Sequence, residues 1–313
     1  MSEWRPLSSA DIAARRGDLL ERTRKYFADQ GVLSVDTPSL SLSAPSDPNI
    51  QALSVDDSDH YLHTSPEFFM KRLLAAGYPD IFSICRVFRG GERGRKHLPE
   101  FTMVEWYRHS MTLDAIVADT VQFIAEILER PTLSGKLRRQ DYVTAFRRML
   151  DLDPCTASID ALANAAAADK RLRASIGDDR DAWLDLIMAT KISPEFDKDG
   201  LTVIQHYPLS QASLARVCPS NPQVADRFEV YFGTLELANG YVELTDADEL
   251  ACRFEQDLRV RRARGLPELV RDEQNVAAHR AGLPDCAGVA LGFERLHMID
   301  ADTDDIRNVV SFA

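Results

Sequence analysis

The alternation of apolar and polar positions along the chain predicts helices near the N-terminus and strands separated by long irregular connections. Residues 11–30 carry apolar side chains at helical spacing, and a second helix is predicted to open at 64–67. Further along, the pattern predicts strands over 81–88 and 101–108, mainly helix over about 112–200, strands over 201–244, a helix over 245–264, and a strand from 286 that enters a final helix. Strands without regular βαβ alternation favour an α+β fold with an antiparallel β-sheet flanked by helices.

Composition narrows the class of protein. The chain has 313 residues, of which 45% are hydrophobic and 27% charged, so it can bury a large core. The length alone allows one large domain or two ordinary ones. The formal net charge of −12 argues against a protein that binds nucleic acid over a broad surface.

The same sequence predicts a cytoplasmic location and no membrane contact. It contains no apolar run long enough to span a bilayer, and its first residues lack the apolar stretch of a signal peptide. Its five cysteines lie far apart without a CxxC pair, which argues for reduced thiols.

The strand predicted at 101–107 presents unusual chemistry on one face. Because side chains of a strand alternate between faces, Phe101, Met103, Glu105 and Tyr107 share one side. A carboxylate and a phenol beside an aromatic ring suit a pocket that binds an amine and stacks a flat ring. A solvent-facing edge with one ion pair explains the same residues.

Asn239-Gly240 lies between two extended segments and predicts a two-residue hairpin turn. That turn would place Glu236 directly opposite Glu243. Facing like charges destabilise a sheet, and a divalent cation such as Mg²⁺ would remove the conflict. The alternative is a looser turn, with both acids in water.

A nearly bare strand face is predicted at Gly288, Ala290 and Gly292, with Val289 pointing into the core. Such a strip lets a ligand lie flat against the backbone. Arg295 then falls in the first turn of the next helix, where a cation opposes the helix dipole unless an anion is bound. Close helix–sheet packing with Arg295 on the surface is the alternative.

A run of cations in this acidic chain favours a polyphosphate site over a solvated face. Its members are Arg86, Arg89, Arg93, Arg95, Lys96 and His97.

Three segments together resemble the three motifs of a class II aminoacyl-tRNA synthetase catalytic core of the lysyl type. They are residues 31–38, 86–107 and 288–295. A narrower resemblance links 64–74, 211–215, 227–231, 236–247, 253–257 and 283–286 to the lysyl-tRNA synthetase paralogues that attach (R)-β-lysine to a lysine of elongation factor P. The resemblance extends over about residues 12–312.

The resemblance implies an ATP site. Arg89 would hold the α-phosphate and Arg295 the γ-phosphate, which makes these two the expected catalytic residues, and Phe101 would stack on adenine. Further ATP contacts are expected from Gly90, Gly91, Glu92, Leu98, Glu236, Leu237 and Gly292. Glu236 and Glu243 are the expected Mg²⁺ ligands.

The amino-acid substrate, (R)-β-lysine or lysine, would be bound by residues that offer carboxylates and hydroxyls to its ammonium groups. They are Ser65, Pro66, Glu67, Glu105, Tyr107 and Glu243, with Ala290 on the wall. True lysyl-tRNA synthetases carry Gly at the position of Ala290. One added methyl there could shift the choice from α- to β-lysine by about 1–3 kcal/mol.

Two departures from the family pattern fall in the second motif. Arg89-Gly90-Gly91 stands where the family has Arg-Asn-Glu, and Leu98 replaces an Asn. We hypothesise that Glu92 takes over from the missing glutamate through a one-residue shift in the loop.

These resemblances predict a cytoplasmic, homodimeric, ATP-dependent ligase that forms an amide, AMP and pyrophosphate, with elongation factor P as acceptor in place of tRNA. Residues 1–313 are expected to form one catalytic domain with a mainly helical insertion at about 112–200 and no anticodon-binding OB domain. The alternatives are another small class II-like amino-acid ligase and a non-catalytic paralogue that acts as a regulatory binding subunit.

Overall fold

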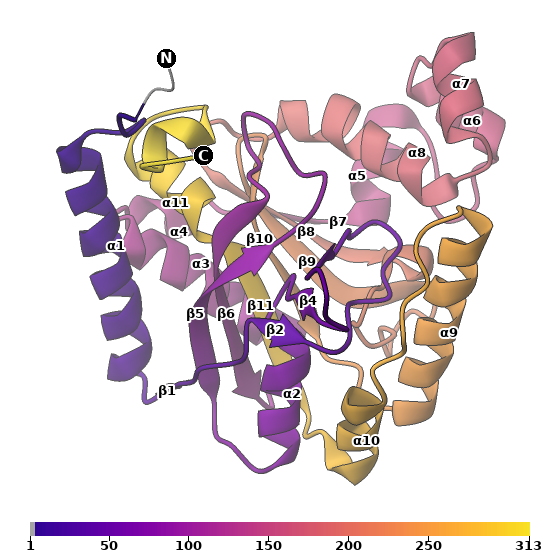
Figure 1. Cartoon of the computed structure of the whole chain (residues 1–313). Helices are drawn as coiled ribbons and strands as arrows, with labels where there is room; N and C mark the ends of the chain where they lie inside the picture. The colour runs from indigo at the N-terminus through magenta and orange to yellow at the C-terminus, as the bar shows by residue number, and fades with distance from the viewer. Residues whose placement is uncertain (1–3) are drawn as a thin grey trace.

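An eight-stranded sheet forms the centre of the computed structural model, which describes residues 4–313 (Figure 1). Six neighbouring strands are antiparallel, and the short strand at each edge pairs in parallel. Across the sheet the order is β1 (Leu33–Ser34), β5 (Ile81–Phe88), β6 (Glu100–His109), β11 (Cys286–Gly292), β10 (Leu235–Val242), β9 (Val224–Phe232), β8 (Leu201–Pro208) and β7 (Arg138–Asp141). The predicted α+β class with an antiparallel sheet is confirmed.

One face of the sheet carries the main hydrophobic core. Helices α1 (Ala10–Asp29), α3 (Leu113–Ile127) and α11 (Phe293–Asp300) pack on it. Phe27 of α1 and Trp106 of β6 are fully buried there, with ring centroids 5.4 Å apart. The core holds the central strands rigidly from behind, so the other face can carry polar chemistry.

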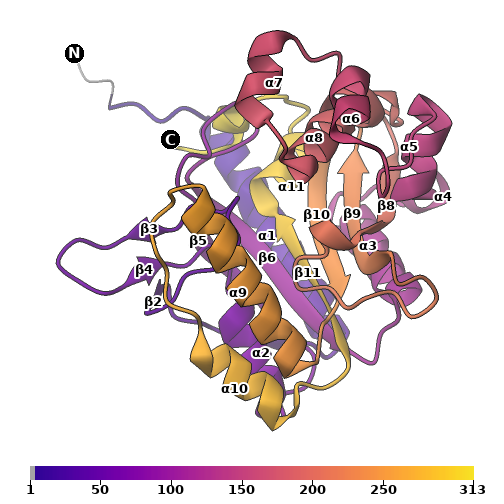
Figure 2. The same ribbon diagram turned by 90° about the vertical axis from the view of Figure 1, so that its right-hand side faces the viewer.

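The opposite face is only partly covered. Helices α2 (Glu67–Ala75), α9 (Ala247–Ala263) and α10 (Glu273–Gly282) lie over it, as Figure 2 shows. The helix α2 begins where the sequence predicts, and Ser65 Oγ accepts a hydrogen bond from the Glu67 N–H at its start. A three-stranded sheet of β2 (Leu40–Ser41), β4 (Tyr61–Leu62) and β3 (Leu53–Ser54) flanks this face.

The stretch predicted as a helical insertion is largely helical in the structure, but its beginning belongs to the main body. Helix α3 packs into the core described above, and β7 extends the large sheet. A separate hydrophobic cluster gathers the segments that follow. They are α5 (Tyr142–Leu150), α6 (Ile159–Ala165), α7 (Lys170–Ile176), α8 (Arg180–Ile187) and a π-helical turn (Met188–Ile192). The short α4 (Thr132–Gly135) precedes these segments, and a 3₁₀ turn (Ser193–Glu195) follows them.

The hairpin predicted at Asn239-Gly240 is wrong. Both residues lie inside β10, and the turn lies earlier, at Gly233-Thr234, between the paired Phe232 and Leu235. Gly233 adopts a left-handed φ of 53° there.

Gly240 serves close packing instead of a turn. A Cβ on it would lie 2.5 Å from the Phe228 ring and 2.9 Å from the Gly288 carbonyl oxygen. A glycine inside a strand often marks such a close approach.

Among the described residues, no helix is long and apolar enough to cross a bilayer.

Candidate active site

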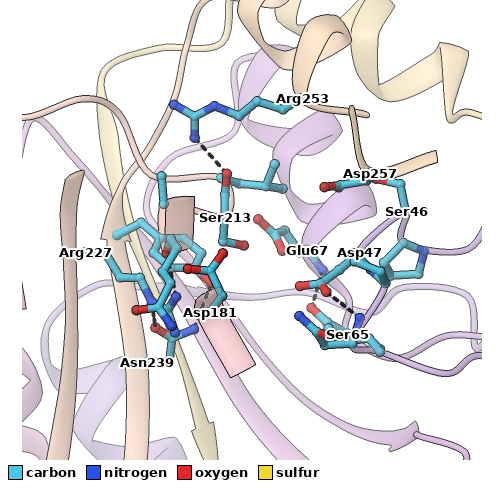
Figure 3. Close-up of a pocket in the computed structure, with 18 of the residues that line it drawn as sticks. Ser46, Asp47, Ser65, Glu67, Asp181, Ser213, Arg227, Asn239, Arg253 and Asp257 are labelled. Atoms are coloured by element: carbon cyan, nitrogen blue, oxygen red, sulfur yellow. Dashed lines mark hydrogen bonds between the residues drawn. The ribbon is translucent and has the colours of Figure 1, made fainter. Parts of the chain in front are cut away.

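Two adjoining cavities open on the partly covered face of the sheet. The larger has a volume of about 910 Å³ and the smaller about 250 Å³. In Figure 3, Ser65 and Glu67 lie on one side of the larger cavity, and Arg227 and Asn239 on the other. The residues that line both cavities, and so mark their junction, are Arg89, Met103, Glu236, Asn239 and Ala290.

The smaller cavity collects most of the residues predicted to bind ATP. They are Arg89, Glu92, Leu98, Phe101, Glu236, Leu237, Gly292 and Arg295. Arg295 lies in the first turn of α11, as predicted, and donates to the Glu236 carbonyl oxygen at 2.8 Å. Its other terminal nitrogen lies 2.7 Å from Nε2 of His97. These contacts hold a guanidinium against the helix dipole and toward the cavity, which suits an anionic ligand.

Arg89 stands at the junction. Its guanidinium lies over the Phe101 ring at 5.4 Å and donates from Nε to the Thr64 carbonyl oxygen at 3.3 Å. The Glu92 carboxylate lies 3.8 Å from Nη1 of Arg89. Arg89 is therefore fixed from three sides while its charge faces both cavities.

The predicted basic run does not act as one cluster. Arg86 lies within 3.7 Å of Glu100, and Arg95 lies 2.5 Å from Asp304. Arg93 is exposed and lines neither cavity. Of the six cations in this run, only Arg89, Lys96 and His97 line the smaller cavity. The sequence could not separate these cations, because loop geometry decides which of them point inward.

A β-bulge in β10 decides which of its side chains face the site. The register shifts between Glu236 and Ala238, so Leu237 and Ala238 both point into the hydrophobic core. Beyond the bulge the alternation resumes. Glu236, Asn239, Tyr241 and Glu243 thus all line the larger cavity. Without the extra residue, Glu236 and Glu243 would lie on opposite faces.

Glu236 and Glu243 do not face each other, because both lie along one strand segment. At a rise of about 3.3 Å per residue they are roughly 20 Å apart. Glu236 lies near Arg295, whereas Glu243 lies 2.6 Å from the Lys71 ammonium. The predicted pairing of the two carboxylates around one cation is therefore wrong.

Near Glu236 the second carboxylate belongs to Glu229 on the neighbouring strand. Desolvation and repulsion from Glu229 raise the pKa of Glu236. Glu229 is already bonded to the Arg227 guanidinium at 2.6 Å and to the Tyr231 hydroxyl. Oxygen ligands from one or two carboxylates, completed by phosphate oxygens, are what Mg²⁺ prefers. Glu236 fits that role.

The far end of the larger cavity is built from carboxylates. Glu105 is buried and accepts hydrogen bonds from the hydroxyls of Ser65 and Tyr107, both at 2.7 Å. This confirms that Glu105 and Tyr107 share one face of the strand β6. The Lys71 ammonium lies 2.7 Å from Glu67, one helical turn away on α2.

Protonation at this end is tuned by burial. Burial and the nearby Glu67 charge raise the pKa of Glu105 to about 8. Burial raises the pKa of Glu243 to about 7, although the Lys71 ammonium opposes the shift. Empty, the pocket therefore holds at least one protonated carboxyl group near pH 7.

The predicted bare strip on β11 is only partly open. A Cβ on Gly288 would lie 2.4 Å from the Tyr107 ring and 2.5 Å from a Glu243 oxygen, so these side chains pack closely against the glycine. Ala290 and Gly292 do line the smaller cavity. Gly288 lets Tyr107 and Glu243 approach the backbone, and it lines the larger cavity beside these two side chains.

Three predicted site residues lie off the cavity walls. Pro66 precedes α2 at its N-cap, and Gly90 packs against Gln51, with 2.9 Å from its ideal Cβ position to that side chain. Gly91 adopts a left-handed φ of 77° in the same turn. Backbone contacts from this turn remain a prediction.

Sequence reasoning missed Lys71, Arg227 and Asn239. The spacing of Glu67 and Lys71, four residues apart on a helix, was the available signal for Lys71. Arg227 donates to Asn239 at 3.2 Å across the β9–β10 pair. That contact was hidden because Asn239 was assigned to a turn.

Comparison with known proteins identifies the family of this architecture. The model of the tRNA synthetases of class II (D, K and N) matches residues 3–313. A Klebsiella pneumoniae protein named "Elongation factor P--(R)-beta-lysine ligase" is 41% identical over 99% of this chain and 97% of its own length. A protein of the same name from Salmonella paratyphi B shows the same identity and coverage. The chain therefore belongs to the class II tRNA synthetase family of the aspartyl, lysyl and asparaginyl (D, K and N) type.

Proposed function

We propose that this protein is an ATP-dependent ligase that activates (R)-β-lysine as an acyl-adenylate and transfers it to a lysine side chain of elongation factor P. The relatives that match nearly end to end are named as ligases of elongation factor P and (R)-β-lysine. Family membership supports ATP as the activating substrate. The site described above supplies the chemistry that each half of this reaction needs.

The position of Arg89 carries the proposal. It stands where a small cavity with aromatic and cationic walls meets a larger cavity that ends in carboxylates. ATP in the smaller cavity would place its α-phosphate near Arg89, with adenine on Phe101 and the γ-phosphate at Arg295. A diamino acid anchored at the carboxylate end would direct its own carboxylate to the same arginine.

In the first step, a substrate carboxylate oxygen attacks the α-phosphate in line, and the bond to the bridging oxygen of pyrophosphate breaks. Arg89 and Arg295 stabilise the negative charge that builds up in this step. In the second step, the neutral acceptor amine attacks the acyl-adenylate carbonyl, an amide forms, and AMP leaves with the bonding electrons. The amine's proton passes to solvent. No enzyme nucleophile takes part.

The geometry supports Glu236 as the main protein ligand for a Mg²⁺ that would enter with ATP and neutralise phosphate charge. Glu243 is assigned to the amino acid instead, because it is held by Lys71 at the other end of the strand. Ser65, Glu67, Glu105 and Tyr107 are its proposed partners there. Ala290, on the wall of both cavities, is proposed to favour β-lysine over α-lysine.

We further propose a single-domain homodimer that does not use tRNA. Leu33 on the edge strand β1 and Tyr78 in the connection between α2 and β5 are 44% and 41% exposed, and both offer apolar surface to a partner subunit. The net charge of −12 disfavours tRNA as the acceptor.

The activity is tested by ATP–pyrophosphate exchange with (R)-β-lysine, with α-lysine and without amino acid, followed by mass spectrometry of elongation factor P. We expect exchange that depends on (R)-β-lysine, and a mass increase on one acceptor lysine. Exchange without modification of elongation factor P would favour another small ligase. Nucleotide binding without any exchange would favour a regulatory subunit.

Glu92→Ala tests whether Glu92 replaces the glutamate missing from the second motif. Its carboxylate lines the smaller cavity beside Arg89, so we expect the KM for ATP to rise about tenfold. The KM for the amino acid should change little. Exchange kinetics at varied ATP measure both values, and an unchanged KM for ATP would contradict the hypothesis. Glu100→Ala, on an exposed carboxylate outside both cavities, is the matched control.

A further inference from the structure

Lys71 is the most completely enclosed charge at the carboxylate end of the larger cavity. Its side chain has no exposed surface, and its ammonium lies 2.7 Å from Glu67 and 2.6 Å from Glu243. Burial lowers the pKa of Lys71, but the charges of Glu243 and Glu67 outweigh burial and raise it overall. Lys71 therefore stays charged and fixes two carboxylates at once.

The other titratable groups around this cluster are neutral near pH 7. Burial and the Lys71 charge lower the pKa of His279 on α10. Burial raises the pKa of Cys85 on β5 to about 12, and it also raises the pKa of Cys286 on β11. Burial and Glu105 raise the pKa of the Tyr107 phenol. What remains is one ammonium and the carboxyl groups of Glu67, Glu105 and Glu243.

These charges can be counted. When all three carboxyl groups are ionised, the three carboxylates and the one ammonium of the pocket have a net charge of −2. The two ammonium groups of a diamino acid carry +2, so they neutralise the pocket. Without substrate, one of the three carboxyl groups is protonated. The second ammonium of the substrate neutralises the negative charge that appears when this group ionises. Buried charges are stable only when they are paired, so the count matters energetically.

We propose that Lys71 is a positioning residue that sets the charge of this pocket, so that it takes amino acids with two ammonium groups in preference to those with one. The inference deepens the proposed function and rests on it, because it concerns the substrate class of the same site. Lys71 itself has no surface in the cavity and acts through Glu67 and Glu243.

The proposal has a consequence for protons. Glu105 holds a proton in the empty pocket at pH 7 and loses it to solvent when the second ammonium binds. Affinity for a diamino acid should therefore rise with pH up to about pH 8, by as much as tenfold per unit, and then level off. Calorimetry in buffers of different ionisation enthalpy should count about one released proton per lysine bound, and fewer for 6-aminohexanoate, which has one ammonium.

Lys71→Met removes the charge and keeps most of the side-chain volume. Without the Lys71 charge, Glu105 and Glu243 take up protons more readily, so the KM for the diamino acid at pH 7 should rise at least tenfold. The pH range over which this KM falls should move to higher pH. The kcat at saturation should change much less. The double variant Lys71→Met/Glu67→Gln loses one positive and one negative charge, so two carboxylates again match the two ammonium groups of the substrate. We expect it to regain much of the affinity that Lys71→Met loses.

A purely structural lysine would give a different pattern. Lys71→Met would then lose active protein without moving the pH profile, and the double variant would be no better than the single one; either result in folded protein overturns the proposal. If Lys71→Met does not fold, Glu67→Gln alone remains informative. Because the Glu67 charge raises the pKa of Glu105, this variant should move the pH profile to lower pH. An unmoved profile would again overturn the proposal.

A failure of the proposed ligase function can be distinguished from a failure of the proposal for Lys71. Wild-type protein that shows no exchange with any amino acid contradicts the ligase assignment. The charge count would still be measured in that case, because calorimetry compares lysine with 6-aminohexanoate on the wild-type chain without turnover. Equal affinity for both compounds would overturn the inference about Lys71.

Discussion

Arg89→Ala is expected to lower amino-acid-dependent ATP–pyrophosphate exchange by about 10³-fold, mainly in kcat. The guanidinium stands at the junction of the two cavities, so it would meet the charge that develops on the α-phosphate. Removal of such a charge from a partly enclosed site cannot be compensated by water. The folded state should persist, because the residue is not part of the hydrophobic core. Exchange kinetics and circular dichroism measure both effects.

Arg93→Ala is the matched control for this variant. It removes the same kind of side chain from the same loop, four residues later, but Arg93 is exposed and lines neither cavity. Its exchange rate should stay within about twofold of wild type. Equal loss in both variants would show that the loop contributes only net positive charge. Full activity in Arg89→Ala would contradict the site.

Gly240→Ala is expected to lower the free energy of unfolding by about 3 kcal/mol. The new methyl would lie 2.5 Å from the ring of Phe228, which is fully buried, and 2.9 Å from the Gly288 carbonyl oxygen. The ring has little room to rotate away, and the carbonyl moves only if β11 shifts. Urea unfolding, followed by fluorescence and by circular dichroism, measures the midpoint and its slope.

Gly17→Ala makes the same chemical change where space is open. Gly17 lies inside α1, and an added Cβ would meet nothing within 4 Å. Alanine there should stabilise the helix by about 0.5–1 kcal/mol. If both variants unfold at the wild-type midpoint, Phe228 relaxes freely and the close-packing explanation of Gly240 is incorrect.

Local patterns were sufficient for much of the fold. The period of apolar residues located α1, and the alternation over 101–108 placed Glu105 and Tyr107 on the face opposite Trp106. The placement of Arg295 in a first helical turn followed from the strand that precedes it. These inferences needed only neighbours in sequence, which is why they succeeded.

The wrong predictions concern positions whose conformation depends on contacts with segments that are distant in the sequence. Asn-Gly is a strong turn signal, but Gly240 is required by Phe228 and Gly288, which no local pattern reveals. The conflict between Glu236 and Glu243 disappeared with that turn. Lys71 was overlooked because its second partner, Glu243, is distant in sequence and meets it only in the folded chain.

The extra residue at Leu237 also constrains how this segment can evolve. Glu236 and Glu243 are seven positions apart, so a regular strand would place them on opposite faces. The extra residue brings both onto the same face. Loss of a single codon there would leave both glutamates in the sequence but turn one of them into the core. A substitution of Leu237 by another apolar residue should disturb the site far less than this deletion, because it leaves the direction of both glutamates unchanged. We therefore expect this segment to tolerate substitutions at most positions better than the deletion or insertion of one residue.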